Sequence, residues 1–177
     1  MSHALYSNRG TALEELIDAA NARYRSLRVA LIDKYPTAFV PIRSGDRFIS
    51  AKVEKKSIVD YRGHAVVNEK AIPLAFEAKE VSVGDRFYLK NLSDHQYKYL
   101  RDNHLMGGFS FVLIAFWQVQ RFYVLPFLEL EKRRAEWKKG GKAHVKAGEP
   151  GLIEVCFPDY LSFLFSAEEK RKKNGKE

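Results

Sequence analysis

The chain has almost none of the residues that form covalent cross-links or thiolate metal sites. Cys156 is the one cysteine among 177 residues, which excludes an internal disulfide and gives no sign of a cysteine-based zinc site. We expect Cys156 to act as a small buried hydrophobic residue. Long apolar runs are also missing, because the longest, residues 109–117, contains Ser110 and is far too short to span a bilayer. With no apolar signal core near the N-terminus, these features predict a soluble, cytoplasmic protein with no membrane partner.

Positive charge, by contrast, is in excess. There are 30 lysine and arginine residues against 22 aspartate and glutamate residues, a formal net charge of +8, which favours a polyanionic partner. Part of the excess lies at residues 166–177, which we expect to form a basic, disordered tail. Because 46% of the chain is apolar, residues 1–165 are expected to form one domain with its own core.

The apolar periodicities predict an α/β fold. Apolar residues recur at helical spacing between residues 11 and 27, and two further helices are expected at residues 93–104 and 127–139. Gly45 and Asp46 mark a turn between the first two extended segments. Strands are expected at residues 38–42, 48–53, 58–61, 72–79, 109–116 and 119–125. A loop is expected at residues 62–71.

Two of these extended segments carry charged residues at a spacing that suits phosphodiester chemistry. Side chains two residues apart on a strand share a face, so Glu77 and Lys79 are expected to project together. If the two segments are antiparallel neighbours, Asp60 lies beside Glu77. The two carboxylates and the backbone carbonyl of Ala78 would then offer hard oxygen ligands to Mg²⁺, or to Mn²⁺ in its place, with Lys79 next to the metal-bound water.

The same residues also fit an ordinary solvated sheet face. Exposed strands often alternate charged and apolar side chains, and an aspartate with a Glu-x-Lys triplet occurs by chance in many chains. The flanking sequence favours a site, because apolar β-prone residues precede both Asp60 and Glu77. The two carboxylates are therefore expected where buried strands emerge.

A wider pattern consists of six segments in a fixed order along the chain: Asn8-Arg9-Gly10-Thr11-Ala12-Leu13-Glu14-Glu15, Lys34-Tyr35-Pro36-Thr37, Val59-Asp60-Tyr61-Arg62-Gly63, Phe76-Glu77-Ala78-Lys79-Glu80, Asn91-Leu92-Ser93-Asp94-His95-Gln96 and Pro158-Asp159-Tyr160-Leu161. This pattern resembles the RecU family of Holliday junction resolvases, which belong to the PD-(D/E)XK nuclease superfamily. The similarity runs from Asn8 to about Phe165. The family usually has hydroxyl residues directly before its aspartate, whereas this chain has Ile58 and Val59 there and keeps a hydroxyl only at Ser57.

The resemblance implies a fold, an activity and an assembly. The fold would be a mixed central sheet flanked by helices, with a β-hairpin stalk at residues 39–56 that projects toward the centre of a four-way DNA junction. The activity would be metal-dependent endonucleolytic cleavage of that junction in recombination and repair. Cutting two strands at matched positions implies a homodimer with twofold symmetry. The resemblance also implies a nucleoid-associated protein, with a strand-exchange recombinase as a further partner.

Three residues near helix starts have two interpretations each. In the family that the chain resembles, the glutamate of the first helix faces the site, so Glu14 is a candidate catalytic residue that completes a second metal position. Residues 11–14 also fit a capping box, in which the glutamate returns to the backbone N–H at the helix start. Gln96 has the same ambiguity, because residues 93–96 fit a capping box too. His95 either contacts phosphate or is simply a polar surface residue.

Ten basic residues are candidates for DNA contact: Arg9, Arg43, Arg47, Lys52, Lys55, Lys56, Arg62, Lys132, Arg133 and Arg134. Several lie in or beside the expected hairpin, where Phe39 and Phe48 are interleaved with them, as suits binding of a branched backbone. A solvated edge hairpin protected by lysines explains these charges nearly as well. The basic residues of the helix at 127–139 either touch a flanking DNA arm or keep the helix soluble.

Alternative functions remain open at this stage. One is another PD-(D/E)XK DNA nuclease that acts on ends, flaps or modified DNA. Another is a catalytically weak or silent junction-binding recombination factor, which the replacement of hydroxyls at Ile58 and Val59 favours and the presence of Asp60, Glu77 and Lys79 opposes. A third is a basic α/β domain with no nuclease role.

Overall fold

The computed structural model describes residues 11–35, 38–45, 47–55 and 58–165. Its centre is a six-stranded mixed sheet with the strand order β1-β4-β5-β7-β8-β10. All neighbouring pairs are antiparallel except β5 and β7, which are parallel. The strands are β1 (Ala30–Lys34), β4 (Tyr61–Val67), β5 (Lys70–Val81), β7 (Phe109–Phe116), β8 (Arg121–Pro126) and β10 (Ile153–Val155).

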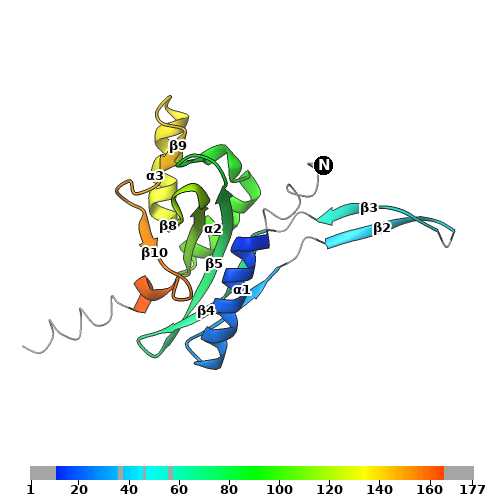
Figure 1. Ribbon diagram of the computed structural model, residues 1–177, viewed down its shortest axis with the longest axis horizontal. Helices are drawn as coiled ribbons and strands as arrows, with labels where there is room; N and C mark the ends of the chain where they lie inside the picture. The colour runs from blue at the N-terminus through cyan, green and yellow to red at the C-terminus, as the bar shows by residue number, and fades with distance from the viewer. Residues whose placement is uncertain (1–10, 36–37, 46, 56–57, 166–177) are drawn as a thin grey trace, which may run out of the picture.

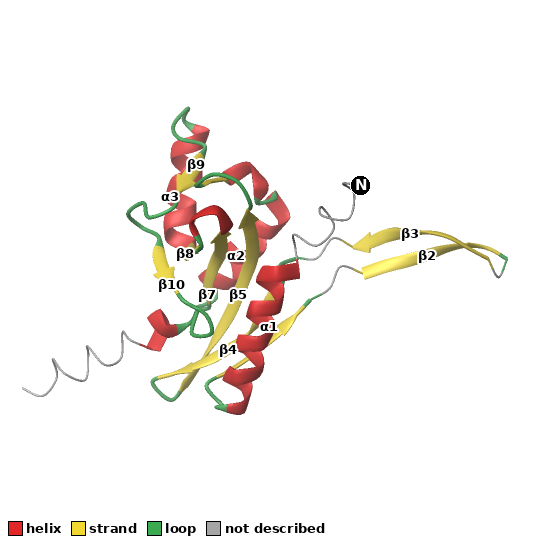
Figure 2. Ribbon diagram, viewed as in Figure 1, coloured by secondary structure: helices red, strands yellow, loops and turns green. Residues whose placement is uncertain are grey.

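Helices cover both faces of this sheet (Figure 2). Helix α1 (Thr11–Ser26) packs on one face, and α2 (Asp94–Leu105) and α3 (Phe127–Lys138) pack on the other. Short elements complete the fold: η1 (Leu89–Asn91), η2 (Trp117–Val119), and a small sheet of β6 (Arg86–Tyr88) and β9 (His144–Lys146). The predicted mixed α/β sheet flanked by helices is confirmed.

Alternation along the central strands creates two core layers. On β5, Leu74 and Phe76 point toward α1, whereas Ala75 points toward α2 and α3. The α1 layer holds stacked rings, with Phe76 centred 4.9 Å from Tyr61 and 4.6 Å from Phe111. By the same alternation, Glu77 lies on the α2 side of the sheet. The charged residue therefore belongs to a buried strand that has apolar layers on both faces.

The segment before and after Asp60 differs from the prediction. A strand was expected at residues 58–61 and a loop at 62–71, but β4 begins at Tyr61 and runs to Val67. It turns directly into β5 at Asn68 and Glu69, whose φ angles of 51° and 60° fit the left-handed backbone of a two-residue hairpin turn. Strand β4 forms there because it pairs with both β1 and β5, and its Ala65 is fully buried in the core.

Gly63 explains how closely β4 approaches its other neighbour. It pairs with Ile32 of β1, and a Cβ at this position would overlap the backbone carbonyl of Leu31. Only glycine fits such an approach. Strand β1 itself was not predicted from the sequence, although it forms one edge of the central sheet.

A separate two-stranded sheet projects from the body (Figure 1). It consists of β2 (Ala38–Ser44) and β3 (Arg47–Lys55), joined through Gly45 with a φ of 58°. The hairpin expected at residues 39–56 is therefore present. The expected tail at 166–177 lies outside the described residues, and the single domain expected at 1–165 stays a prediction.

Cys156 was expected to be buried, but it is exposed. It follows the short edge strand β10, where little packs over it. Among the described residues, no helix is both long and apolar enough to cross a membrane.

Candidate active site

Asp60 and Glu77 lie together at the start of β4. The register pairs Tyr61 with Phe76, so the residue before β4 lies opposite the residue after Phe76. The Asp60 N–H donates to Oε2 of Glu77 over 3.2 Å, and the Ala78 N–H donates to Oδ2 of Asp60 over 3.0 Å. The expected proximity of the two carboxylates is present, although Asp60 precedes the strand rather than lying within one.

Glu77 is the most constrained charge of this cluster. Its side chain is only 1% exposed. Burial, together with the negative charge of Asp60, raises the pKa of Glu77 to about 7, against the opposing effect of Lys79. Two carboxylates so close in a poorly solvated place repel each other unless a cation or a proton intervenes.

Lys79 supplies part of the neutralising charge. Its Nζ lies 2.7 Å from Oε1 of Glu77, and its side chain is 23% exposed, so the ammonium bridges the buried carboxylate and the surface. The backbone of Ala78 faces Asp60 through its N–H. Because the N–H and C=O of one strand residue point to the same edge, the Ala78 carbonyl also points toward the side where β4 has not yet begun.

Helix α2 contributes a side chain that sequence reasoning left unassigned. Oε1 of Gln96 accepts the Ser93 N–H over 3.1 Å, which forms half of a capping box, while Nε2 of Gln96 donates to Oε1 of Glu77. The capping role and the site role are therefore both present in one amide. His95 is exposed, and its Nε2 lies 3.3 Å from the hydroxyl of Ser93.

Among the described residues, Glu14 shows no hydrogen bond to a backbone N–H at the helix start, and its place at a second metal position stays a prediction. Its Oε2 instead accepts from Nζ of Lys34 over 2.8 Å. This hydrogen bond, despite partial desolvation, raises the pKa of Lys34, and the charges of Asp18 and Asp60 act in the same direction. Lys34 thus links α1 electrostatically to Asp60. In the sequence, Lys34 belongs to the family-like segment at residues 34–37, but no local signal marks it as a site residue.

The start of α1 is capped from β5. The Leu13 N–H donates to Oε1 of Glu80 over 3.0 Å, and Oε2 of Glu80 accepts from Nε1 of Trp117 over 2.9 Å. A carboxylate at a helix N-terminus is favourable because it satisfies unpaired amides and complements the helix dipole. The residue after Lys79 therefore fixes the helix that carries Glu14.

Arg62 lies on β4 two residues after Asp60. Its guanidinium carbon is 3.4 Å from the ring centroid of Tyr35, and its Nη1 donates to the hydroxyl of Tyr99 over 3.3 Å. The Tyr35 N–H donates to the backbone carbonyl of Asp60 over 2.7 Å. Sequence reasoning included Arg62 among the DNA contacts but missed both tyrosines.

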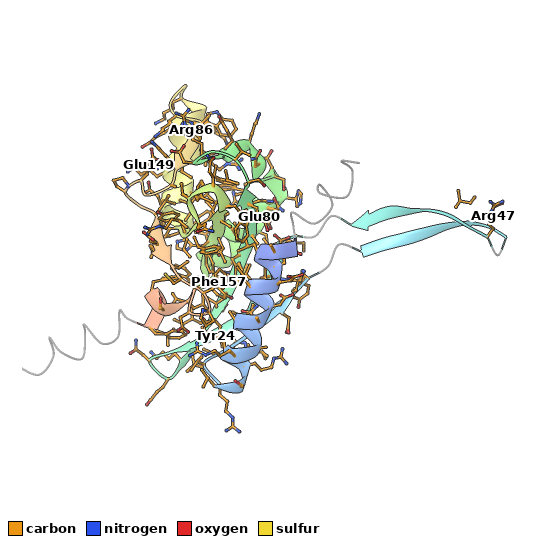
Figure 3. All side chains as sticks on the ribbon, in the orientation of Figure 1. Tyr24, Arg47, Glu80, Arg86, Glu149 and Phe157 are labelled. Carbon is orange, nitrogen blue, oxygen red and sulfur yellow. The ribbon has the colours of Figure 1, made fainter. Side chains whose placement is uncertain are left out.

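The hairpin candidates are only partly described. Arg47 is exposed and lies near the far end of the hairpin (Figure 3). The backbones of three others lie in β2 and β3, but their side chains are outside the described part: Arg43, Lys52 and Lys55. Arg9 and Lys56 lie outside the described residues altogether.

Two of the three candidates on α3 require correction. Arg134 is 7% exposed, and its guanidinium donates to Asp94 and to the carbonyl of Leu92. The side chain of Arg133 is 16% exposed and bonds Glu129, Glu149 and the carbonyl of Pro150. Both arginines hold the fold together rather than face DNA. Lys132 is exposed, and its DNA contact stays a prediction.

The carboxylate site fits a hard divalent cation. It offers Asp60, Glu77 and the Ala78 carbonyl, all oxygen donors of the kind that Mg²⁺ and Mn²⁺ prefer. In the described part of the chain, no three histidine, cysteine, aspartate or glutamate side chains converge on one point. A cation at this site would therefore keep water or phosphate oxygens as further ligands, as Mg²⁺ commonly does.

Comparison with known proteins shows the family to which the sequence belongs. The sequence model of the family described as Recombination protein U matches residues 8–150. The chain belongs to the RecU family. Three relatives, each named Holliday junction resolvase RecU, illustrate the similarity. The relative from Leuconostoc mesenteroides is 36% identical over 132 residues, which are 71% of this chain and 63% of the relative.

The alignments with the other two relatives cover more of this chain. The protein from Pediococcus pentosaceus is 32% identical over 147 residues, which are 80% of this chain and 71% of the relative. The protein from Bacillus licheniformis is 32% identical over 167 residues, which are 89% of this chain and 79% of the relative. The resemblance stated from the six segments is confirmed.

Proposed function

We propose that this protein is a structure-selective endonuclease that resolves four-way DNA junctions by paired phosphodiester hydrolysis. The observation that carries the proposal is the meeting of Asp60, Glu77 and Lys79 on one face of the sheet. Relatives named Holliday junction resolvase support the choice of substrate.

Mg²⁺, with Mn²⁺ able to substitute, is the proposed cofactor. Asp60, Glu77 and the Ala78 carbonyl would hold it, and a bound cation supplies charge that neutralises a phosphate and acidifies a water molecule. The raised pKa of Glu77 supports this assignment. A cation between the carboxylates would oppose the burial and the repulsion by Asp60 that raise the pKa of Glu77.

The surrounding side chains would orient this site. The Nζ of Lys79 lies beside Glu77, where it would orient the attacking water and, as an ammonium, offset negative charge as it develops. Gln96 holds the Glu77 carboxylate from the side of α2. Glu14 would complete a second metal position, and Lys34, which joins it to the neighbourhood of Asp60, would hold it there.

DNA would be recognised by shape and by its phosphates. The hairpin, with Arg47 near its far end, would enter the junction centre, together with the basic residues predicted in or beside it: Arg43, Lys52, Lys55 and Lys56. Arg9 is a further proposed DNA contact. Lys132 would contact a flanking arm. Two copies of the chain would act on the two strands, since matched cuts require two sites. Binding through phosphates would weaken steeply with salt.

A junction-binding protein with weak cleavage is the second candidate. The observation that favours it is Val59, which is fully buried directly before Asp60, while the neighbouring Ile58 is 45% exposed. Neither offers a hydroxyl to a metal or a phosphate. This candidate shares the DNA surface and differs only in the rate of hydrolysis.

The deciding experiment is cleavage of a labelled four-way junction beside linear duplex of the same sequence. Wild type and Asp60→Asn are compared in Mg²⁺, in Mn²⁺ and in EDTA. We expect paired, symmetric, metal-dependent nicks in the junction alone, which disappear in Asp60→Asn. Tight junction binding without nicks supports the second candidate, and cutting of the linear duplex points to a broader nuclease.

A further inference from the structure

We propose that Tyr35, Arg62 and Tyr99 form a clamp beside the carboxylate site, in which the tyrosines hold the Arg62 guanidinium for the DNA phosphate next to the scissile one. This inference rests on the proposed nuclease function and assigns two new positioning residues. Arg62 is the binding group, and the tyrosines act through it.

The guanidinium is held from two directions. Its carbon lies 3.4 Å from the ring centroid of Tyr35 and 5.5 Å from that of Tyr99, and its Nη1 also donates to the Tyr99 hydroxyl. A free arginine side chain carries about 2 kcal/mol of rotamer entropy. Stacking and the hydrogen bond remove much of that freedom before a ligand arrives, so the arginine is preorganised.

Each member of the clamp is tied to the carboxylate site. Arg62 follows Asp60 by two residues, about 7 Å along an extended chain, a distance comparable with one nucleotide step of a DNA strand. The backbone of Tyr35 donates to the carbonyl of Asp60. Tyr99 lies one helical turn after Gln96, which bonds Glu77. A phosphate on Arg62 therefore lies beside the carboxylates.

The guanidinium of Arg62 has hydrogen-bond donors and a positive charge that an anion could bind. Among the described residues, no carboxylate pairs with Arg62, and the one hydrogen bond of its side chain is that from Nη1 to Tyr99. Its Nε is buried without a hydrogen-bond partner, so the Nη groups are the donors left for an anion. Tyr35 is 44% exposed, so the clamp lies at the surface. The faces of a guanidinium stack on rings while its edge donors match phosphate oxygens.

Arg134 provides the structural contrast within the same fold. It also stacks on a tyrosine, with its guanidinium carbon 4.3 Å from the ring centroid of Tyr97. Unlike Arg62, it has a carboxylate partner in Asp94 and donates to a backbone carbonyl. Arg134 thus stacks on a tyrosine and also pairs with a carboxylate. Arg62 stacks on tyrosines but pairs with no carboxylate in the described part of the chain.

Single-turnover cleavage of a four-way junction at saturating enzyme tests the clamp. We expect Arg62→Gln to lower the rate by about 10- to 100-fold, as misplaced substrates do, and Arg62→Lys to restore little because it cannot stack and bind at once. Tyr35→Leu should lower the rate less, and Tyr35→Phe should recover most of that loss. Arg86→Gln removes an exposed arginine elsewhere and serves as the matched control.

A second readout identifies the phosphate itself. Two junctions are made, each with a neutral methylphosphonate in place of one of the two phosphates that flank the scissile phosphate. Wild type should cut one of these junctions more slowly than the unmodified junction. Arg62→Gln should cut that same modified junction no more slowly than it cuts the unmodified one. In EDTA, Arg62→Gln should reduce the slope of log affinity against log salt by about 0.9, the value of one phosphate contact. Melting temperatures verify that each variant is folded.

The outcomes separate this inference from the proposed function. If wild type cuts the junction and Arg62→Gln cuts it within twofold of that rate, the clamp is overturned and the nuclease stands. An equal methylphosphonate effect in both proteins also overturns the clamp. If wild type binds the junction but cuts no junction in Mg²⁺ or Mn²⁺, the nuclease itself fails, and an unchanged salt slope would then reject the clamp as well.

Discussion

At the scale of single residues, Glu77 is where the hydrogen bonds of the carboxylate site converge. One buried carboxylate receives hydrogen bonds from the Asp60 backbone, from Lys79 and from Gln96. The donors favour its charged form, while burial and the charge of Asp60 oppose it and raise its pKa to about 7. The balance of these effects sets the protonation of the site near neutral pH.

The raised pKa of Glu77 predicts how stability depends on pH in EDTA. An acid that binds its proton more tightly in the folded state stabilises that state fully below its ordinary pKa of 4.5, and this contribution is lost as the pH rises through about 7. The melting temperature should therefore contain a component that falls over this range. Glu77→Gln, which stays neutral, should lack that component, and an identical pH profile for both proteins would contradict the prediction.

Gln96 should matter more for cleavage than for folding. Gln96→Leu removes the donor to Glu77 and should lower the cleavage rate by about 10- to 100-fold, the usual cost of losing a group that orients a metal ligand. Ser93→Ala is the matched control, because it removes the hydroxyl that donates to Oε1 of Gln96 and weakens the same cap at a cost of about 1 kcal/mol. The Ser93 N–H and the Glu77 carboxylate still contact the Gln96 amide. Equal rates for the two variants would show that Gln96 only caps the helix.

At the scale of elements, α2 and α3 divide the basic residues into structural and exposed ones. Arg134 reaches from α3 to the start of α2, where it bonds Asp94 and the Leu92 carbonyl. Since Gln96 follows within the first turn of α2, this contact helps to place the amide on Glu77. Lys132, two residues earlier on α3, is exposed.

This division predicts opposite effects for two substitutions on one helix. Arg134→Gln should lower the free energy of unfolding by about 1–3 kcal/mol, because buried polar groups lose their partners, without changing the salt dependence of junction binding. Lys132→Gln should change stability by less than about 0.5 kcal/mol and reduce the salt slope by about 0.9. Denaturant unfolding and binding titrations measure both quantities. A weaker salt slope in Arg134→Gln would restore that residue as a DNA contact.

At the scale of the whole molecule, the hairpin and the sheet are separate units of structure. Strands β2 and β3 pair only with each other among the described strands, whereas the central sheet carries the carboxylates. The two ends of the segment meet where the Tyr35 N–H bonds the Asp60 carbonyl over 2.7 Å. We therefore expect the hairpin to recognise the shape of the junction and the central sheet to carry out hydrolysis.

Replacing residues 36–57 by a short glycine-serine linker should separate these two roles. Because the ends of the segment are already close, the linker should leave the melting temperature of the body within a few degrees. The preference for a junction over linear duplex should fall by at least about tenfold, since that loss corresponds to only about 1.4 kcal/mol of contacts. An undiminished preference would show that the body alone recognises the junction.

The sequence by itself determined the three helices, strands β5, β7 and β8, the hairpin and the proximity of Asp60 to Glu77. These follow from periodicity and from residue types that act locally, so they are visible in the linear chain. The prediction of a loop at residues 62–71 was wrong, because the charged and polar residues there mask the strand pattern of β4. That strand forms through its pairing with β1 and β5.

Only the tertiary structure decided which polar groups meet across the fold. It brought Gln96 to Glu77, paired Lys34 with Glu14, buried Arg134 and stacked Tyr35 on Arg62. Each of these contacts joins elements that are distant along the chain, and several residues of the same type compete for every partner. The packing of helices on the sheet selects among them, which no local pattern encodes.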